Sequence, residues 1–268
     1  MIRSARRIAL GVAAGALVLA AAAPVAADNH EAMVRVLHAS PDAPNVDVWV
    51  DDAPALTDVP FKTLSDYLAL PAGEHQVKVT PAGDADTAVI EAAVTVEGGQ
   101  RYTIAAINEL ASIEAKVLVD DANPTADGVK VRIVHFSPDA GAVDVAPDGA
   151  DALVPGLEFP NATGYVDLAA GAYDLEIRAA GTETVALDLP EITLEAGNAY
   201  SVFAVGSAAA GSLDVVIGSD GSAMPATDTV GAQAPSSGAG WLAAAAIVAL
   251  GALASVAGIR RFAAVRAR

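Results

Sequence analysis

Two ten-residue stretches decide the fold: residues 34–43 read VRVLHASPDA and residues 131–140 read VRIVHFSPDA. The likeness continues downstream, where a Val-Asp-Val triplet at 46–48 recurs at 143–145. The spacing between copies is 97 residues at the start of the unit and 98 towards its end. A constant spacing over so long a segment indicates an internal duplication.

Each copy has the pattern of a β-domain. Val46, Val48 and Val50 alternate with other residue types, as in a strand buried on one face. Further short runs, separated by Gly and Pro turns, lie at residues 76–80, 88–96, 101–107 and 114–119, and at 174–178, 192–194, 200–205 and 213–217. Six or seven short strands per copy predict two tandem antiparallel β-sandwiches, immunoglobulin-like or transthyretin-like.

Both ends of the chain have the pattern of export and anchoring segments. Residues 1–27 combine a basic start, an apolar run and small residues before a cleavage site after Ala27, which predicts a signal peptide. Residues 241–259 are uncharged and would span about 28 Å as a helix, enough to cross a membrane. The basic tail 260–268 is then expected to stay cytoplasmic.

The chain therefore divides into seven predicted parts. These are a signal peptide (1–27), the first sandwich (28–121), a linker (122–128), the second sandwich (129–220), a flexible stalk (221–240), a transmembrane helix (241–259) and a basic cytoplasmic tail (260–268). We expect an exported single-pass protein with extracellular domains.

Charge and cysteine content exclude several classes of function. Seven of the 15 basic residues lie in the two terminal segments, whereas all 33 acidic residues lie between them. Such a surface repels nucleic acid and favours cations or basic partners. With no cysteine, the chain has no disulfide and no thiolate metal site. Each sandwich is then expected to be stable through its own packing alone.

A polar motif in both copies contains the residue types of a hydrolase triad. It consists of His38, Ser40, Pro41 and Asp42, repeated as His135, Ser137, Pro138 and Asp139. Ser-Pro-Asp is also a turn signature, and no Gly-x-Ser-x-Gly elbow accompanies it. A fold-defining turn is needed in each copy, so we interpret the motif as structural, with a hydrogen-bonded His38. We expect Ser40→Ala to lower thermal stability and to leave any hydrolase activity unchanged.

Acidic clusters are candidates for a calcium site. The oxygen ligands that Ca²⁺ prefers are supplied near one loop and in the linker by Asp42, Asn45, Asp47, Asp120, Asp121, Asn123 and Asp127. A linker-bound Ca²⁺ would stiffen the tandem. The sequence contains no EF-hand loop, and acidic residues are abundant throughout. Calcium is thus the single cofactor that the sequence suggests.

The paired motifs resemble a known family. The segments that begin at Val34 and Val131 and run through His-x-Ser-Pro-Asp-Ala to Val-Asp-Val resemble domain-of-unknown-function family 4397. The resemblance covers about residues 32–220 and implies a β-sandwich on an exported bacterial surface protein. It implies no established activity. The second copy departs from the first at Gly141, Ala146 and Pro147.

A shorter resemblance concerns anchoring. Met224-Pro225-Ala226-Thr227-Asp228, followed by a spacer, an apolar run and a basic tail, resembles the cell-wall sorting signals cut by sortases. It has Met224 where Leu is usual and Asp228 where Gly is usual. Transfer to the cell wall and simple retention in the membrane remain alternatives.

Three functions are compatible with these features. The first is a non-catalytic surface-display, adhesion or ligand-binding protein whose partner is an extracellular protein or glycan. The second is a calcium-stiffened structural envelope protein. The third is an extracellular hydrolase that uses His38, Ser40 and Asp42. The absence of a coherent catalytic set favours the first.

Overall fold

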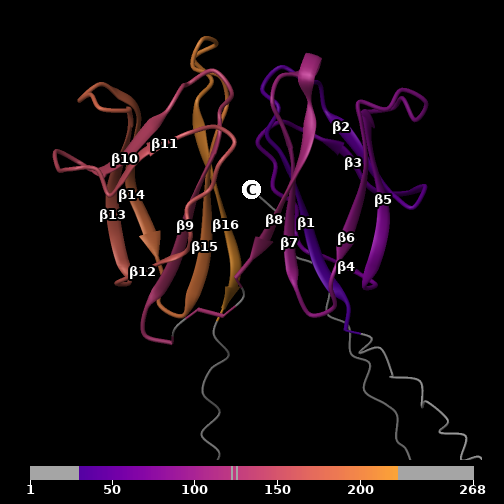
Figure 1. Cartoon of the computed structure of the whole chain (residues 1–268), viewed down its shortest axis with the longest axis horizontal. Coiled ribbons are helices and arrows are strands. Elements are labelled where there is room, and N and C mark those ends of the chain that lie inside the picture. Colours follow the sequence, from indigo (N-terminus) through magenta and orange to yellow (C-terminus); the bar gives the residue numbers. More distant parts are fainter. Residues whose placement is uncertain (1–29, 122, 125, 223–268) are drawn as a thin grey trace, which may run out of the picture. The chain divides into compact units, whose positions relative to one another are not determined.

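The computed structural model describes residues 30–222, with the exception of 122 and 125 (Figure 1). The chain divides into two compact units, Met1–Pro225 and Ala226–Arg268, and the described strands all lie in the first. The predicted signal peptide, most of the stalk, the sorting-like motif and the apolar run 241–259 lie outside the described residues. Within the described residues, no helix has the length and apolarity needed to cross a membrane.

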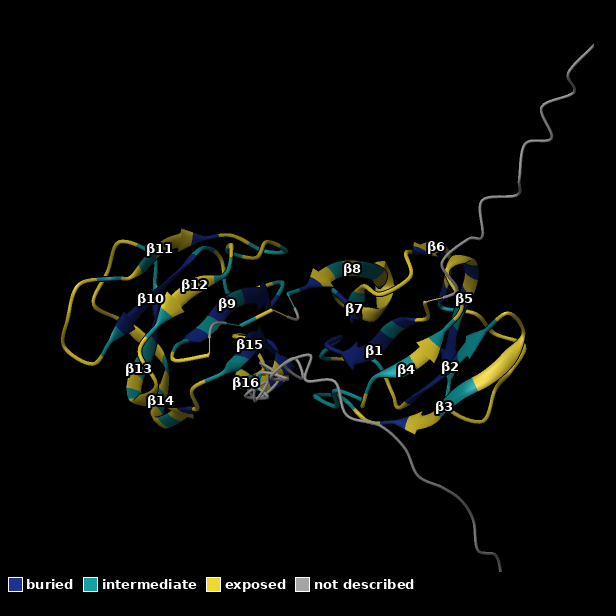
Figure 2. Cartoon of the chain, turned by 90° about the horizontal axis from the view of Figure 1, so that it is seen from below, coloured by how far each residue is buried: buried dark blue, intermediate teal, exposed yellow. Residues whose placement is uncertain are grey.

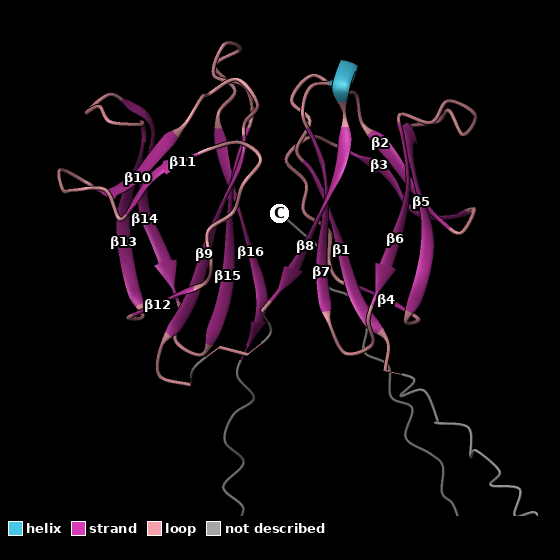
Figure 3. Cartoon of the chain, viewed as in Figure 1, coloured by secondary structure: helices cyan, strands magenta, loops and turns pink. Residues whose placement is uncertain are grey.

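The first repeat is a sandwich of two four-stranded sheets. One sheet has the order β4-β1-β7-β8 and the other the order β3-β2-β5-β6. The strands of this repeat are β1 Ala32–His38, β2 Val46–Val50, β3 Ala53–Val59, β4 Leu68–Leu70, β5 Gly73–Pro81, β6 Ile90–Val96, β7 Arg101–Ile107 and β8 Glu114–Asp120. A single 3₁₀ turn, η1 at Leu110–Ser112, precedes β8 (Figure 3).

The second repeat has the same layout, as the duplication predicts. Its sheets have the orders β12-β9-β15-β16 and β11-β10-β13-β14. Its strands are β9 Val129–Phe136, β10 Val143–Pro147, β11 Val154–Leu157, β12 Val166–Leu168, β13 Gly171–Ala179, β14 Val185–Leu194, β15 Asn198–Val205 and β16 Asp214–Ser222. The prediction of an all-β chain with two sandwich-like domains is confirmed.

The expectation of purely antiparallel sheets is wrong at one ladder in each repeat. Strand β1 pairs parallel with β7, with Val34 opposite Tyr102, and β9 pairs parallel with β15 in the same way. Parallel neighbours require a long connection between them. Here that connection is the whole second sheet of each sandwich, so β1 and β9 lie at the centre of their sheets rather than at an edge.

The two central strands of one sheet in each repeat, β1 and β7 in the first and β9 and β15 in the second, are buried on both faces (Figure 2). In β1, Val34 and Val36 point into the interior of the first sandwich, where they pack with Tyr102 and Ile104. The intervening side chains point to the other face of the sheet, because successive residues of a strand alternate. A face that a single sandwich would leave in water is therefore covered.

A hydrophobic cluster that both repeats share covers this second face. It consists of Leu37, Ala39, Ala105 and Ile107 from the first repeat with Val134, Phe136, Phe203 and Val205 from the second. All eight side chains are fully buried. The expectation that each sandwich packs on its own therefore does not describe this face. The two repeats bury a common core between their β1-containing and β9-containing sheets.

Candidate functional site

The repeated histidine of the polar motif closes the turn that follows β1 or β9. Nε2 of His38 donates to the Pro44 carbonyl oxygen at 3.0 Å, and Nε2 of His135 donates to the Gly141 carbonyl oxygen at 2.8 Å. Burial lowers the pKa of both imidazoles, so they stay neutral. The predicted hydrogen-bonded role of His38 is confirmed by this geometry.

The motif does not assemble a nucleophile and a base. Ser40 and His38 are both 0% exposed, and Ser40 Oγ and His38 Nδ1 make no hydrogen bond among the described residues. In the second repeat, His135 Nδ1 accepts from the backbone N–H of Ser137 at 3.3 Å rather than from its hydroxyl. A triad needs the serine hydroxyl bonded to the base and open to substrate.

The expected loss of stability in Ser40→Ala needs correction. The Ser40 hydroxyl is buried and has no partner among residues 30–222 as described, and a buried unpaired polar group is unfavourable. Its removal is therefore not expected to destabilise the fold.

The aspartate of the motif ties the turn to a loop that is distant in sequence. Asp42 Oδ1 accepts from the backbone N–H of Leu110 at 2.7 Å. In the second repeat, Asp139 accepts from the Ser207 hydroxyl at 2.6 Å and from the backbone N–H groups of Ala208 and Ala209. The motif thus joins the end of the first strand of each repeat to the loop after β7 or β15.

The calcium candidates have separate structural roles. Asp47 accepts from the backbone N–H groups of Asp58 at 2.7 Å and Gly83 at 2.9 Å, which lowers its pKa. Asp144, its counterpart, makes the same two backbone bonds, to Gly156 and Gly181. The Val-Asp-Val repeat therefore joins edge strand β3 or β11 to the turn that follows β5 or β13.

The remaining calcium candidates do not converge either. Asn45 donates to Asp58, and Asp121 pairs with Lys130 at 2.7 Å. Asp121 also accepts from the backbone N–H of Asn123, whereas Asp127 is exposed. Over the described part of the chain, no group of three or more His, Cys, Asp or Glu side chains is arranged to hold a metal ion. Asp120, the last candidate, lies at the end of β8 and takes part in the network below.

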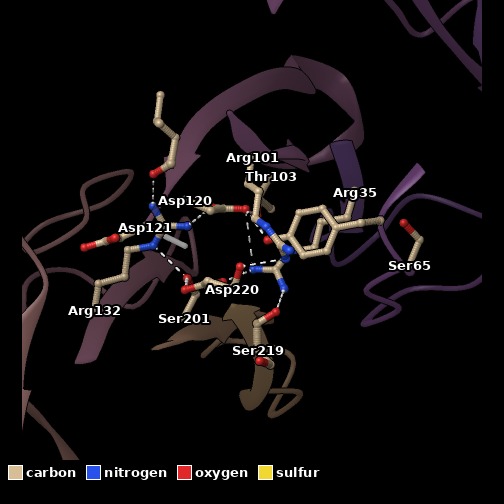
Figure 4. A network of polar contacts seen from close by, with 12 residues as sticks. Arg35, Ser65, Arg101, Thr103, Asp120, Asp121, Arg132, Ser201, Ser219 and Asp220 are labelled. Carbon is tan, nitrogen blue, oxygen red and sulfur yellow. Dashed lines mark hydrogen bonds and ion pairs between the residues drawn. The ribbon is translucent and has the colours of Figure 1, made fainter. Parts of the chain in front are cut away.

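Four buried charges lie between the repeats, and each arginine pairs with the aspartate of the other repeat (Figure 4). Arg35 of β1 donates through Nη2 to Asp220 of β16, and Arg132 of β9 donates through Nη2 to Asp120 of β8. The Nη1 groups also donate to the other repeat: that of Arg35 to the Ser219 carbonyl oxygen and that of Arg132 to the Val119 carbonyl oxygen. The two halves of the network are related as the repeats are.

Each aspartate is further held by its own repeat. Asp120 Oδ2 accepts from the Tyr67 hydroxyl at 2.6 Å and the Thr103 hydroxyl at 2.7 Å. Asp220 Oδ2 accepts in the same way from Tyr165 and Ser201. Thr103 and Ser201 in turn accept from the Nε–H groups of the two arginines. Burial raises the pKa of both tyrosines, so they remain donors.

The arginines also stack on these tyrosines. The guanidinium carbon of Arg35 lies 4.7 Å from the Tyr67 ring centroid, and that of Arg132 lies 5.0 Å from the Tyr165 ring centroid. All four charges are therefore both paired and hydrogen-bonded, the condition under which buried ions are tolerated.

The shared hydrophobic cluster is complementary rather than symmetric. Where the second repeat has Phe136 and Phe203, whose rings stack with centroids 6.0 Å apart, the first repeat has Ala39 and Ala105 at the matching positions. Two first repeats facing each other would leave a hollow, and two second repeats would crowd four phenylalanines. The apolar contact therefore favours pairing of unlike repeats.

Sequence reasoning did not find this network. A signal was present, because Arg35 and Arg132 occupy the same position in the quoted repeat, flanked by branched apolar residues of a strand. A charged residue kept twice within a buried strand indicates a specific partner. The aspartates had no such context, since Asp120 was interpreted as part of an acidic linker.

His75 gives the first repeat a charge that the second lacks. Its Nδ1 lies 2.7 Å from Asp51 Oδ2 and its Nε2 lies 2.8 Å from the Pro71 carbonyl oxygen. Since both partners are acceptors, only the imidazolium can donate to both. The bond to Pro71 and then the bond to Asp51 raise the pKa of His75. At the matching position Tyr173 donates to the Ala169 carbonyl oxygen instead.

We expect the melting temperature of the protein to fall as the pH rises from about 6 to about 8. A folded-state pKa above the unfolded value of about 6.5 gives stability that is complete below that value and is lost as the pH rises through the folded one. His75→Tyr, which copies the second repeat, should flatten this part of a thermal-shift profile. An equal slope in wild type and variant would show that His75 is not its source.

Comparison with known proteins identifies the domains. The sequence model of a family described as "Domain of unknown function (DUF4397)" matches residues 32–146 and 147–233. The boundary between the two matches falls at the end of β10, whereas the structure changes repeat between β8 and β9. No curated protein has a sequence that matches this chain.

Among solved structures, a protein described under "Alpha-glucan binding by a streptococcal virulence factor" is similar to this chain. It has 10% sequence identity and a TM-score of 0.24, and the alignment covers 68% of this chain and 95% of the other.

Proposed function

The chain belongs to the DUF4397 family, and we propose that it is an exported, non-catalytic protein that displays a rigid pair of β-sandwiches at the cell surface for binding an extracellular protein or glycan. The family model matches most of the chain and covers both repeats. The basic–apolar–small pattern of residues 1–27 and the uncharged run 241–259 support export and anchoring.

One observation carries the non-catalytic part of this proposal. The repeated His-Ser-Pro-Asp motif, which contains the residue types of a triad, is used in both copies to close turns, and Ser40 and Ser137 are buried. A catalytic serine has to reach its substrate, whereas a turn does not. The pairing through Arg35 and Arg132 supports a display role, because these buried ion pairs hold one sandwich to the other.

Localisation and catalysis are tested together. We expect externally added protease to digest the sandwiches on intact cells, and the mature protein to begin at Asp28. Purified residues 28–225 should hydrolyse p-nitrophenyl acetate no faster than the Ser40→Ala/Ser137→Ala variant, which lacks both candidate nucleophiles. Protection from protease on intact cells would contradict surface display. A hydrolysis rate that the double variant abolishes would contradict the non-catalytic role.

A further inference from the structure

The second sandwich encloses an apolar cavity between its two sheets. Its volume is about 190 Å³, and its wall consists of aliphatic side chains and Tyr173. Residues from both sheets line it, among them Ile133 and Val202 from one and Leu175 and Leu189 from the other. Apolar cavities of about 150 Å³ in proteins stay dry and bind hydrocarbon molecules of the size of benzene. The space is therefore large enough for a ligand.

The first sandwich is closed at the matching place. There the cavity measures about 30 Å³ and is lined by Val36, Val77 and their neighbours. The second repeat has the larger residues Ile133 and Leu175 at these two positions. Smaller side chains therefore do not explain the larger space at these two positions, although Val202 replaces the larger Ile104 at a third.

A β-bulge distinguishes the second sandwich from the first beside the cavity. The β5–β6 ladder of the first repeat keeps one register from Gly73 to Val79, whereas the β13–β14 ladder shifts between Tyr173 and Leu175. Opposite the shift, β14 contains Pro190, which has no N–H to donate, and Glu191, whose φ is +55°. A bulge bends its strand, and this one lies between the lining residues Leu189 and Ile192.

The edge of the second sandwich is also more open. Edge strand β3 of the first repeat has seven residues, whereas its counterpart β11 has four. The lining residues Leu153 and Val166 beside this edge are 60% and 50% exposed. Their counterparts in the first repeat, Ala55 and Leu68, are half-buried. Ala55 also has a smaller apolar side chain than Leu153. Leu153 and Val166 thus form an apolar mouth between β11 and β12.

We propose that the second repeat binds the hydrocarbon portion of an amphiphile, with a neutral or cationic polar end left in water at the mouth. The wall provides apolar contacts and no charged group. Asp151, which is exposed and lies two residues before Leu153 in the chain, disfavours an anionic end. This inference deepens the proposed binding function and rests on it, because it assigns a ligand class to one of the displayed sandwiches.

The test uses residues 28–225, which contain every described strand. The neutral dye N-phenyl-1-naphthylamine should bind saturably, with one site per chain. 1-Octanol should displace it at a lower concentration than octanoate. Leu189→Trp, which fills the cavity, should weaken dye binding about tenfold or more. Val119→Trp, which places a tryptophan at an exposed apolar position of the first repeat, should leave dye binding unchanged.

Methyl NMR of the wild-type fragment gives a result that does not depend on the folding of a variant. Adding 1-octanol should shift the methyl resonances of Ile177 and Ile192 and leave those of their counterparts Val79 and Val94 in place. The absence of saturable dye binding, equal affinity in Leu189→Trp, or unmoved isoleucine methyls would each overturn the assignment. None of these results would bear on surface exposure or on the lack of hydrolysis, so the two proposals fail separately.

Discussion

Arg35→Met is expected to lower the free energy of unfolding of the 28–225 fragment by about 3–5 kcal/mol. The change removes the cation that Asp220 faces across the repeats and leaves that carboxylate buried with hydroxyl partners alone. Breaking one partner of a buried ion pair costs far more than the pair itself contributes, because the remaining charge is not compensated. Urea denaturation at neutral pH measures the effect.

Two variants serve as controls for this prediction. Lys62→Met removes the exposed pair with Asp214, which also joins the repeats, and should cost no more than about 1 kcal/mol. Arg35→Met combined with Asp220→Asn should be more stable than Arg35→Met alone. Asn removes the orphaned charge and keeps an acceptor for Tyr165 and Ser201. Equal effects of Arg35→Met and Lys62→Met would mean that burial of the network has no energetic consequence.

Phe203→Ala is expected to cost about 3–5 kcal/mol and to weaken the coupling between the repeats. Phe203 is fully buried in the shared cluster and stacks on Phe136, so its loss leaves a cavity at the contact rather than inside one sandwich. We expect urea unfolding of this variant to separate into two steps when each repeat is followed by its own probe. Trp49 reports on the first repeat, since the 28–225 fragment contains no other tryptophan.

Val202→Ala is the matched control on the same strand. Val202 precedes Phe203 in β15 and points into the interior of the second sandwich. Its truncation should destabilise the protein without separating the two transitions. If Phe203→Ala unfolds in one step like wild type, the shared cluster is not what couples the repeats.

The sequence predicted the fold class because its signals are local. Alternating valines at 46–50 and the Gly and Pro turns specify short strands without reference to the rest of the chain. Edge strands such as β3 and β4 were missed, because the residues at 53–59 and 68–70 lack a clear alternation. The parallel ladder was missed because strand direction depends on the path of the chain, which periodicity does not encode.

The contact between the repeats was predictable only in part. The run from Val34 to Leu37 is apolar at both odd and even positions apart from Arg35, a pattern typical of strands covered on both faces. The identity of the partner face was not accessible, because Arg35 pairs with a residue 185 positions away. Asp120 was therefore interpreted as a linker and calcium residue, although it lies at the centre of the buried network.

The turn motif shows the value of a duplication for such reasoning. The second copy of His-Ser-Pro-Asp in the sequence favours a structural role. The hydrogen bonds of His38 and His135 to backbone carbonyl oxygens agree with that role. The differences between copies are as informative as the likeness. The second repeat has phenylalanines in the shared cluster where the first has alanines, and it has Pro190 at the irregular point of β14. The first difference concerns the contact between the repeats, and the second lies beside the cavity of the second sandwich.

Differential scanning calorimetry of the 28–225 fragment tests the coupling of the two sandwiches most directly. If the ion pairs of Arg35 and Arg132 with the opposite repeat and the shared apolar cluster make the two sandwiches unfold together, a single transition should appear, with equal calorimetric and van't Hoff enthalpies. Two resolved transitions in the wild-type fragment, at temperatures that Arg35→Met leaves unchanged, would show that the repeats unfold as independent domains.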